Sequence, residues 1–326
     1  GGAWGYISSC LCHSVLFRVY PTPLKPAWPP PRGGSRGEPG GGALASPRPG
    51  RMINPPREAH PLALAVCNGI QISYDDTDPN TTKTPVIFLH GHGLNRSMWD
   101  HQKQALRGSV RVVAVDLRGH GRSEKPKTGY SRGEEVKDLE GLLGVLRARR
   151  IHLVGLSRGA GLALAFAAAH PERTASVVAI GAGTDHARLM PEFADQRLQT
   201  MATLRAEGLR AAKEYWMSLP IFAPLRANPE ALAKVEQMML TYTGAHWLDP
   251  DPPKDSSLLE LAPRITARTL IMVGEQDLPG FRASADEIAA KIPGAEKVVV
   301  PGAGHLTNLE APEVITQALV GFLGRG

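Results

Sequence analysis

The chain has 326 residues, of which 42% are hydrophobic and 21% are charged, and its formal net charge is +6. These values are typical of a soluble globular protein, and no apolar stretch is long enough for a transmembrane helix. Residues 1–51 contain six lysines and arginines and one acidic residue, so they carry +5 of the net charge. The rest of the chain is nearly neutral, and its charge gives no reason to expect a nucleic-acid partner.

The N-terminal segment differs in composition from the rest of the chain. Residues 1–51 hold nine prolines and ten glycines. Such a segment cannot bury enough apolar surface to offset its ordering entropy, so we predict a disordered, basic extension over residues 1–58. No basic region precedes the apolar stretch "YISSCLCHSVLF", which argues against a signal peptide. The three cysteines form no disulfide framework, and a cytoplasmic location is the expectation.

From residue 62 onward, strand-like and helix-like segments alternate. The stretch "LALAVCNGIQISYDD" predicts a hairpin, because Asn68-Gly69 suits a two-residue turn between alternating runs. Six short apolar runs follow, at residues 85–91, 110–119, 151–157, 175–181, 269–277 and 296–305. Helical patterns lie between or after them, at residues 134–148, 158–169 and 312–323. Continuous apolar strands separated by helices indicate a mostly parallel sheet with both faces covered.

The alternation stops between Gly181 and Thr269. This region has no convincing strand and contains helical patterns at residues 189–207, 209–217 and 230–240. It predicts a helical insertion that covers one edge of the sheet. We therefore expect a core made of residues 59–183 and 265–326, and a helical cap over residues 184–264.

The segment Gly155-Leu156-Ser157-Arg158-Gly159 fits the pattern G-x-S-x-G between a predicted strand and a predicted helix. A tight strand-to-helix turn needs small residues two positions before and after the serine, and it leaves the hydroxyl exposed at the apex. Ser157 as a plain helix N-cap is the simpler alternative, but it does not explain the paired glycines. We predict that Ser157 is a nucleophile.

A serine nucleophile needs a base and an acid that orients the base. His305 lies on a glycine-rich loop after the last predicted strand, and Asp277 ends the strand before it. Their order along the chain, Ser157, Asp277, His305, is one of the known triad orders. Asp185, just after the strand at 175–181, is the alternative acid.

Two backbone N–H groups are expected to bind the oxyanion. One belongs to Arg158, directly after the nucleophile, and the other to His92, on the loop after "VIFLHGHG". "HGHG" also resembles a His-x-His metal site, but no third ligand with suitable spacing is evident, so we expect no metal there. His90 is interpreted as a structural histidine held by hydrogen bonds.

Five motifs in order carry a family resemblance: "FLHGHG", "DLRGHGRS", "GLSRGA", "GEQD" and "GAGHLTNLEAP". Through them, residues 62–323 resemble the α/β-hydrolases with a helical cap, similar to esterases, enol-lactonases and cofactor-free haloperoxidases. The resemblance implies a mostly parallel eight-stranded sheet with helices on both faces, and no metal or organic cofactor. It also implies that Asp116, Arg118 and His120 are scaffold residues.

The expected function is hydrolysis of a small carboxylic ester through an acyl-enzyme, without a nucleic-acid or membrane partner. A lactonase, an enol-lactonase or a perhydrolase with the same triad is the alternative, and a non-catalytic ligand receptor is the alternative of another class. Trp216, Phe222 and Trp247 in the insertion are candidates for an apolar substrate pocket. Arg158 is expected to pair with a carboxylate, and a clamp for an anionic substrate is its alternative role. Oligomeric state stays open.

Overall fold

The computed structural model describes residues 63–184, 186–250 and 255–324. The predicted disordered extension over residues 1–58 and the alternative acid Asp185 lie outside the described residues. Within the described part of the chain, no helix combines the length and the apolar character needed to cross a membrane.

The described residues form an eight-stranded sheet with the strand order β1-β2-β4-β3-β5-β6-β7-β8. The strands are β1 (Ala63–Cys67), β2 (Ile70–Asp76), β3 (Val86–Leu89), β4 (Val112–Val115), β5 (Ile151–Leu156), β6 (Thr174–Ile180), β7 (Arg268–Gly274) and β8 (Glu296–Val300). Strands β3 to β8 are parallel, while β1 and β2 pair antiparallel with each other and β2 pairs antiparallel with β4. The predicted sheet is confirmed, including the hairpin at Asn68-Gly69, where both residues have positive φ as a type I′ turn requires.

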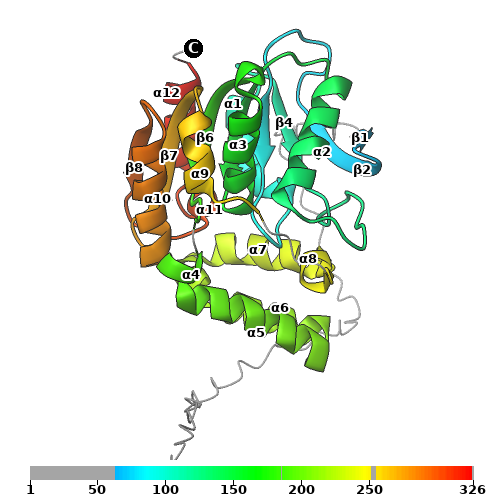
Figure 1. Cartoon of the computed structure of the whole chain (residues 1–326), viewed down its shortest axis with the longest axis vertical. Coiled ribbons are helices and arrows are strands. Elements are labelled where there is room, and N and C mark those ends of the chain that lie inside the picture. The colour runs from blue at the N-terminus through cyan, green and yellow to red at the C-terminus, as the bar shows by residue number, and fades with distance from the viewer. Residues whose placement is uncertain (1–62, 185, 251–254, 325–326) are drawn as a thin grey trace, which may run out of the picture. The chain divides into compact units, whose positions relative to one another are not determined.

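Helices cover both faces of the sheet. The core helices are α1 (Asp100–Leu106), α2 (Arg132–Val145), α3 (Arg158–Ala169), α10 (Pro279–Lys291), α11 (Thr307–Glu310) and α12 (Pro312–Leu323). Side chains alternate along each strand, so Val86 and Phe88 of β3 join one buried cluster with α1 and α12, while Ile87 and Leu89 join another with α2, α3 and α10. Figure 1 shows α2, α3 and α10 lying over the sheet.

The region between β6 and β7 is helical, as predicted. It holds α4 (His186–Leu189), α5 (Pro191–Glu207), α6 (Leu209–Ser218), α7 (Pro229–Thr241), α8 (Ala245–Leu248) and α9 (Leu258–Leu261). In Figure 1, α5, α6 and α7 lie beyond one end of the sheet. We call residues 186–250 the helical insertion. Its large apolar side chains, including Trp216 and Met239, are continuous with the buried cluster that contains Phe88, so the insertion packs on the core.

Candidate functional site

Ser157 stands alone between β5, which ends at Leu156, and α3, which begins at Arg158. Its φ of 54° and ψ of −109° lie in a region that non-glycine residues rarely adopt. Two backbone bonds hold it there: its N–H donates to the carbonyl of Ile180 at 2.8 Å, and its carbonyl accepts from Gly161 at 3.0 Å. Its side chain caps no N–H group of α3, so the N-cap interpretation does not fit.

The paired glycines are required by close backbone packing. A Cβ atom on Gly155 would lie 2.2 Å from the carbonyl oxygen of Gly159, and one on Gly159 would lie 2.2 Å from the carbonyl oxygen of Leu89. Both distances are far below van der Waals contact. Glycine at both positions therefore lets α3 begin directly against β3 and keeps Ser157 at the apex of the turn.

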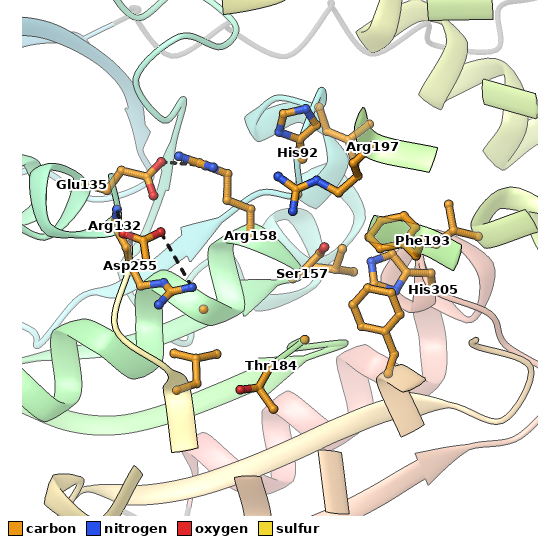
Figure 2. Close-up of a pocket in the computed structure, with 18 of the residues that line it drawn as sticks. His92, Arg132, Glu135, Ser157, Arg158, Thr184, Phe193, Arg197, Asp255 and His305 are labelled. Carbon is orange, nitrogen blue, oxygen red and sulfur yellow. Dashed lines mark hydrogen bonds and ion pairs between the residues drawn. The ribbon is translucent and has the colours of Figure 1, made fainter. Parts of the chain in front are cut away.

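The structure brings Asp277 and His305 together at the carboxyl ends of β7 and β8. The Nδ1 atom of His305 lies 2.9 Å from Oδ2 of Asp277, and Oδ1 of Asp277 accepts from the N–H of Leu278 at 2.8 Å. The Nε2 atom of His305 is buried and has no hydrogen-bond partner within the described residues. His305 and Ser157 line the same cavity (Figure 2). The arrangement leaves one imidazole nitrogen available to a group bound in that cavity.

The loop that carries His305 is held by Glu310, which the sequence analysis did not single out. Its carboxylate accepts from the N–H groups of Gly304 at 2.7 Å and Leu306 at 3.0 Å, on either side of His305. Burial raises the pKa of Glu310 from its ordinary value. In the sequence, its position at the end of "GHLTNLE", five residues after His305, was the feature that could have pointed to this role. Glu310 is therefore a positioning residue for the imidazole.

The two predicted oxyanion donors border the same cavity. His92 lies on the loop after β3, and Arg158 is the first residue of α3. Among the described residues, neither backbone N–H has a hydrogen-bond acceptor. The first N–H groups of a helix lack intrahelical partners, which leaves the donor of Arg158 available. Both groups can therefore donate a hydrogen bond to an oxygen atom of a ligand.

The loop after β3 carries a histidine that belongs to a cluster which the sequence did not reveal. His92 does meet two further histidines, His120 and His246, with one nitrogen of each within 4.8 Å of the others. Sequence spacing concealed this group because its members come from three separate segments. However, His120 uses both nitrogens: Nε2 accepts from the N–H of Gly93 at 3.1 Å, and Nδ1 lies 3.0 Å from the carbonyl of Arg118. A metal ion would have to break the Gly93 bond, so the donor set does not favour one.

His90 is the structural histidine that was predicted. Its Nδ1 lies 2.8 Å from the carbonyl oxygen of Gly91, and its Nε2 accepts from the N–H of Leu117 at 2.9 Å. Because Nε2 accepts, the ring is neutral, and burial lowers the pKa of His90 to about 4. The ring joins the loop after β3 to the loop after β4.

Arg158 pairs with a carboxylate, as expected. Its Nε lies 2.8 Å from Oε1 of Glu135, and its Nη2 donates to the carbonyl of Tyr130 at 2.9 Å. The side chain of Glu135 is buried, and burial raises its pKa while Arg158 lowers it. The charge of Arg158 is thus largely satisfied within the protein.

The cavity has a volume of about 730 Å³, within the range of small-molecule sites. The helical insertion and its turns contribute an apolar wall that consists of Phe193, Trp216, Ile221 and Phe222. Trp216 and Phe222 thus border the cavity. Trp247 does not: its ring packs behind the wall, with centroids 5.7 Å from Trp216 and 5.0 Å from Tyr242. The assignment of Trp247 to the substrate pocket is therefore corrected.

Arg197 of α5 also lines the cavity, although the sequence analysis did not single it out. In Figure 2 its guanidinium projects between His92 and Ser157. No local pattern distinguishes it from the other arginines of the insertion, because its role depends on which partners it has in space.

Comparisons with known proteins agree with this architecture. Over 283 residues, the chain is 27% identical to a putative 2-succinyl-6-hydroxy-2,4-cyclohexadiene-1-carboxylate synthase of Bacillus subtilis, covering 80% of this chain and 97% of that protein. A thermophilic esterase from Thermogutta terrifontis has a TM-score of 0.68 and 28% identity, over 81% of this chain and 98% of the other. The enol-lactonase from Burkholderia xenovorans LB400 has a TM-score of 0.69 and 26% identity, over 80% of this chain and 100% of the other.

The relatives include hydrolases of several substrate types, so they define the family more sharply than the substrate. The eight-stranded sheet, with its helices on both faces, is the fold that these solved structures share with the chain. The model of the alpha/beta hydrolase family matches residues 86–318. The chain belongs to the alpha/beta hydrolase family.

Proposed function

We propose that this protein is a serine hydrolase that cleaves carboxylic esters through an acyl-enzyme. One observation carries the proposal. Nδ1 of His305 is engaged by Asp277 at 2.9 Å, while its Nε2 is unpartnered in the described structure and belongs to the cavity that Ser157 lines. A base held in one tautomer that shares a cavity with a half-buried serine is the arrangement that acyl transfer uses.

In the first half of the reaction, the Oγ atom of Ser157 forms a bond to the acyl carbon while Nε2 of His305 takes the hydroxyl proton. The carbonyl oxygen becomes an oxyanion, which accepts hydrogen bonds from the N–H groups of His92 and Arg158. One such donor contributes about 2.7–4 kcal/mol to the transition state in a comparable site. The C–O bond to the alcohol then breaks, and the imidazolium returns its proton to the leaving oxygen. Asp277 orients and stabilises the imidazolium.

In the second half, a water molecule gives a proton to His305 and attacks the acyl carbon. Collapse of that intermediate releases the carboxylic acid and restores the hydroxyl of Ser157. The net change is ester plus water to acid plus alcohol. The helical insertion serves as the cap of the site, and its apolar wall receives the acyl or alcohol group. The same steps on a cyclic ester describe a lactonase, and one of the structural relatives is an enol-lactonase.

Hydrolysis of p-nitrophenyl acetate, butyrate and octanoate by the wild type and by Ser157→Ala tests the proposal. We expect turnover in the wild type and loss of at least about 10⁴-fold in the variant. Equal turnover in both proteins would contradict the role of Ser157. Turnover of lactones with none of these esters would favour the lactonase alternative.

A further inference from the structure

Arg197 brings a positive charge into the cavity without an anionic partner. Within the part of the chain that the structure describes, its guanidinium donates no hydrogen bond and forms no ion pair. The side chain is solvent-exposed where it lines the cavity. Desolvation by the surrounding protein and the nearby charge of Arg158 lower the pKa of Arg197, and no carboxyl group of the described residues acts on it in the opposite direction.

The other two arginines of the cavity differ from Arg197. Arg158 is paired with Glu135 at 2.8 Å. Arg132 lies against Asp255, whose Oδ1 accepts from its backbone N–H at 2.7 Å and whose Oδ2 lies 4.0 Å from its guanidinium. Each of these cations has an acidic residue of its own. Among the described residues, Arg197 is thus the cavity arginine whose charge is available to an anionic ligand.

The remaining acid of the cavity lining does not serve that role. Glu260 is exposed on α9, which packs against α3, whereas Arg197 enters from α5. Among the described residues, the one group that raises the pKa of Arg197 is the buried phenol of Tyr242. Arg197 therefore adds one positive charge to the cavity wall, which suits a single monoanionic group of a ligand.

Arg197 is solvent-exposed at the cavity wall, and an anion bound there would supply the charge partner that the guanidinium lacks among the described residues. The planar fork of arginine matches the two oxygens of a carboxylate, and such charge-assisted bonds are the strong class of hydrogen bond. In Figure 2 the guanidinium of Arg197 lies between His92 and Ser157. A carboxylate bound there would share the cavity with the reacting serine.

We propose that Arg197 binds a free carboxylate of the substrate, so that the preferred substrate class is an ester that also carries a carboxylate, such as the half-ester of a dicarboxylic acid. The assignment of the bond that is cleaved rests on the proposed function above. The apolar wall of Phe193 and Trp216 then receives the carbon chain that joins the two ends.

Turnover of two esters of equal shape tests the preference. Monomethyl glutarate carries a carboxylate where methyl isoheptanoate carries an isopropyl group, and methanol release measures both. We expect Arg197→Met to lower kcat/KM for monomethyl glutarate about 10- to 100-fold, as expected for loss of a charge-assisted hydrogen bond, and to change the value for methyl isoheptanoate by less than about 3-fold. Arg205→Met, an exposed arginine on the same helix that does not line the cavity, is the matched control and leaves both values unchanged.

Equal loss on the two esters, or a wild-type preference for the neutral ester, would overturn the role of Arg197. Arg197→Lys separates charge from geometry, because it keeps the cation and loses the planar fork. It should retain part of the preference for monomethyl glutarate.

Binding measured without turnover separates this proposal from the proposed function. Isothermal titration calorimetry of glutarate into Ser157→Ala needs no catalysis. We expect glutarate to bind, and Ser157→Ala/Arg197→Met to bind it about 10- to 100-fold more weakly. Arginine-dependent binding without hydrolysis of any ester would support Arg197 and contradict the ester hydrolase. Hydrolysis of neutral esters with no glutarate binding, or with binding independent of Arg197, would do the reverse.

Discussion

The cavity has a core side, formed at the carboxyl ends of the parallel strands, and an insertion side, formed by helices of residues 186–250. The two sides hold their side chains in place in different ways. On the core side, Ser157, Asp277 and His305 follow the ends of parallel strands, and backbone hydrogen bonds fix each of their loops. On the insertion side, Trp216 and Arg197 project from long helices and meet the cavity through side chains alone. Under the proposed function, the sheet edge holds the reacting groups, while the insertion selects the ligand. Substitutions on the two sides should therefore affect different kinetic constants.

The largest expected effect lies on the core side. Asp277→Asn should lower kcat about 10⁴-fold, because the amide no longer holds His305 in the tautomer that leaves Nε2 free. Steady-state kinetics on p-nitrophenyl butyrate measure it. Asp185→Asn is the control, and we expect it to retain kcat within about tenfold. Loss of turnover in Asp185→Asn, with Asp277→Asn active, would give the role of the acid to Asp185.

The turn before α3 is the next most sensitive feature. Gly159→Ala places a Cβ atom 2.2 Å from the carbonyl oxygen of Leu89, which must move α3 or β3. We expect the free energy of unfolding to fall by about 3 kcal/mol, together with loss of activity. Gly144→Ala in α2 meets no atom within 4 Å and should be neutral or stabilising by up to about 1 kcal/mol. Urea unfolding of the two variants compares them, and equal stabilities would contradict the packing argument.

Acid pH should weaken the core side through His90. Burial lowers the pKa of this histidine to about 4 when the protein is folded, against an ordinary value of 6.5. The unfolded chain therefore takes up a proton first as the pH falls, so the stability present above pH 6.5 is progressively lost toward pH 4. From this residue alone we expect the free energy of unfolding to fall by about 2 kcal/mol between pH 6.5 and 5.

Urea unfolding at the two pH values measures this loss. His90→Gln should remove that part of the pH dependence, whereas His101→Gln, an exposed histidine on α1, should keep it. His92, His120 and His246, whose pKa values burial also lowers, act in the same direction. If the free energy of unfolding of His90→Gln fell with pH as steeply as that of the wild type, the conclusion that the His90 ring is neutral in the folded protein would be contradicted.

The smallest expected effect concerns Arg158, which belongs to the core side and should not select between ligands. Because it is paired with Glu135, Arg158→Met should change kcat/KM for monomethyl glutarate and methyl isoheptanoate by the same factor. A double-mutant cycle with Glu135→Gln should give a coupling free energy of about 1–2 kcal/mol in unfolding experiments. A higher KM for the anionic ester alone would make Arg158 the substrate clamp.

Much of the core side was predictable because its determinants are local. The turn at Ser157 was predictable from the five residues Gly155 to Gly159 together with the apolar strand before them and the helical run after them. The clashes at Gly155 and Gly159 show why glycine is needed at both positions. The apolar runs predicted the strands for the same reason. By contrast, α10 was not predicted, since its segment "PGFRASADEIAAK" mixes small and charged residues around a narrow apolar face that includes Phe281 and Ile288.

The insertion side was predictable as helical but not in detail. Trp216 borders the cavity while Trp247 packs behind it, and nothing in the local sequence separates the two. Arg197 and Glu310 were missed for a related reason: the importance of each depends on what lies beside it in space. A cation without a partner is recognised only after the partners of the other arginines are known.

Covalent labelling tests the central claim most directly. Wild type, Ser157→Ala and His305→Ala would each be incubated with diethyl p-nitrophenyl phosphate, and peptide mass spectrometry would locate the diethylphosphoryl group. We predict one group on Ser157 in the wild type, much slower labelling in His305→Ala and none in Ser157→Ala. Labelling of a different residue, or an unlabelled wild type, would contradict Ser157 as an activated nucleophile and would favour a ligand receptor on this fold.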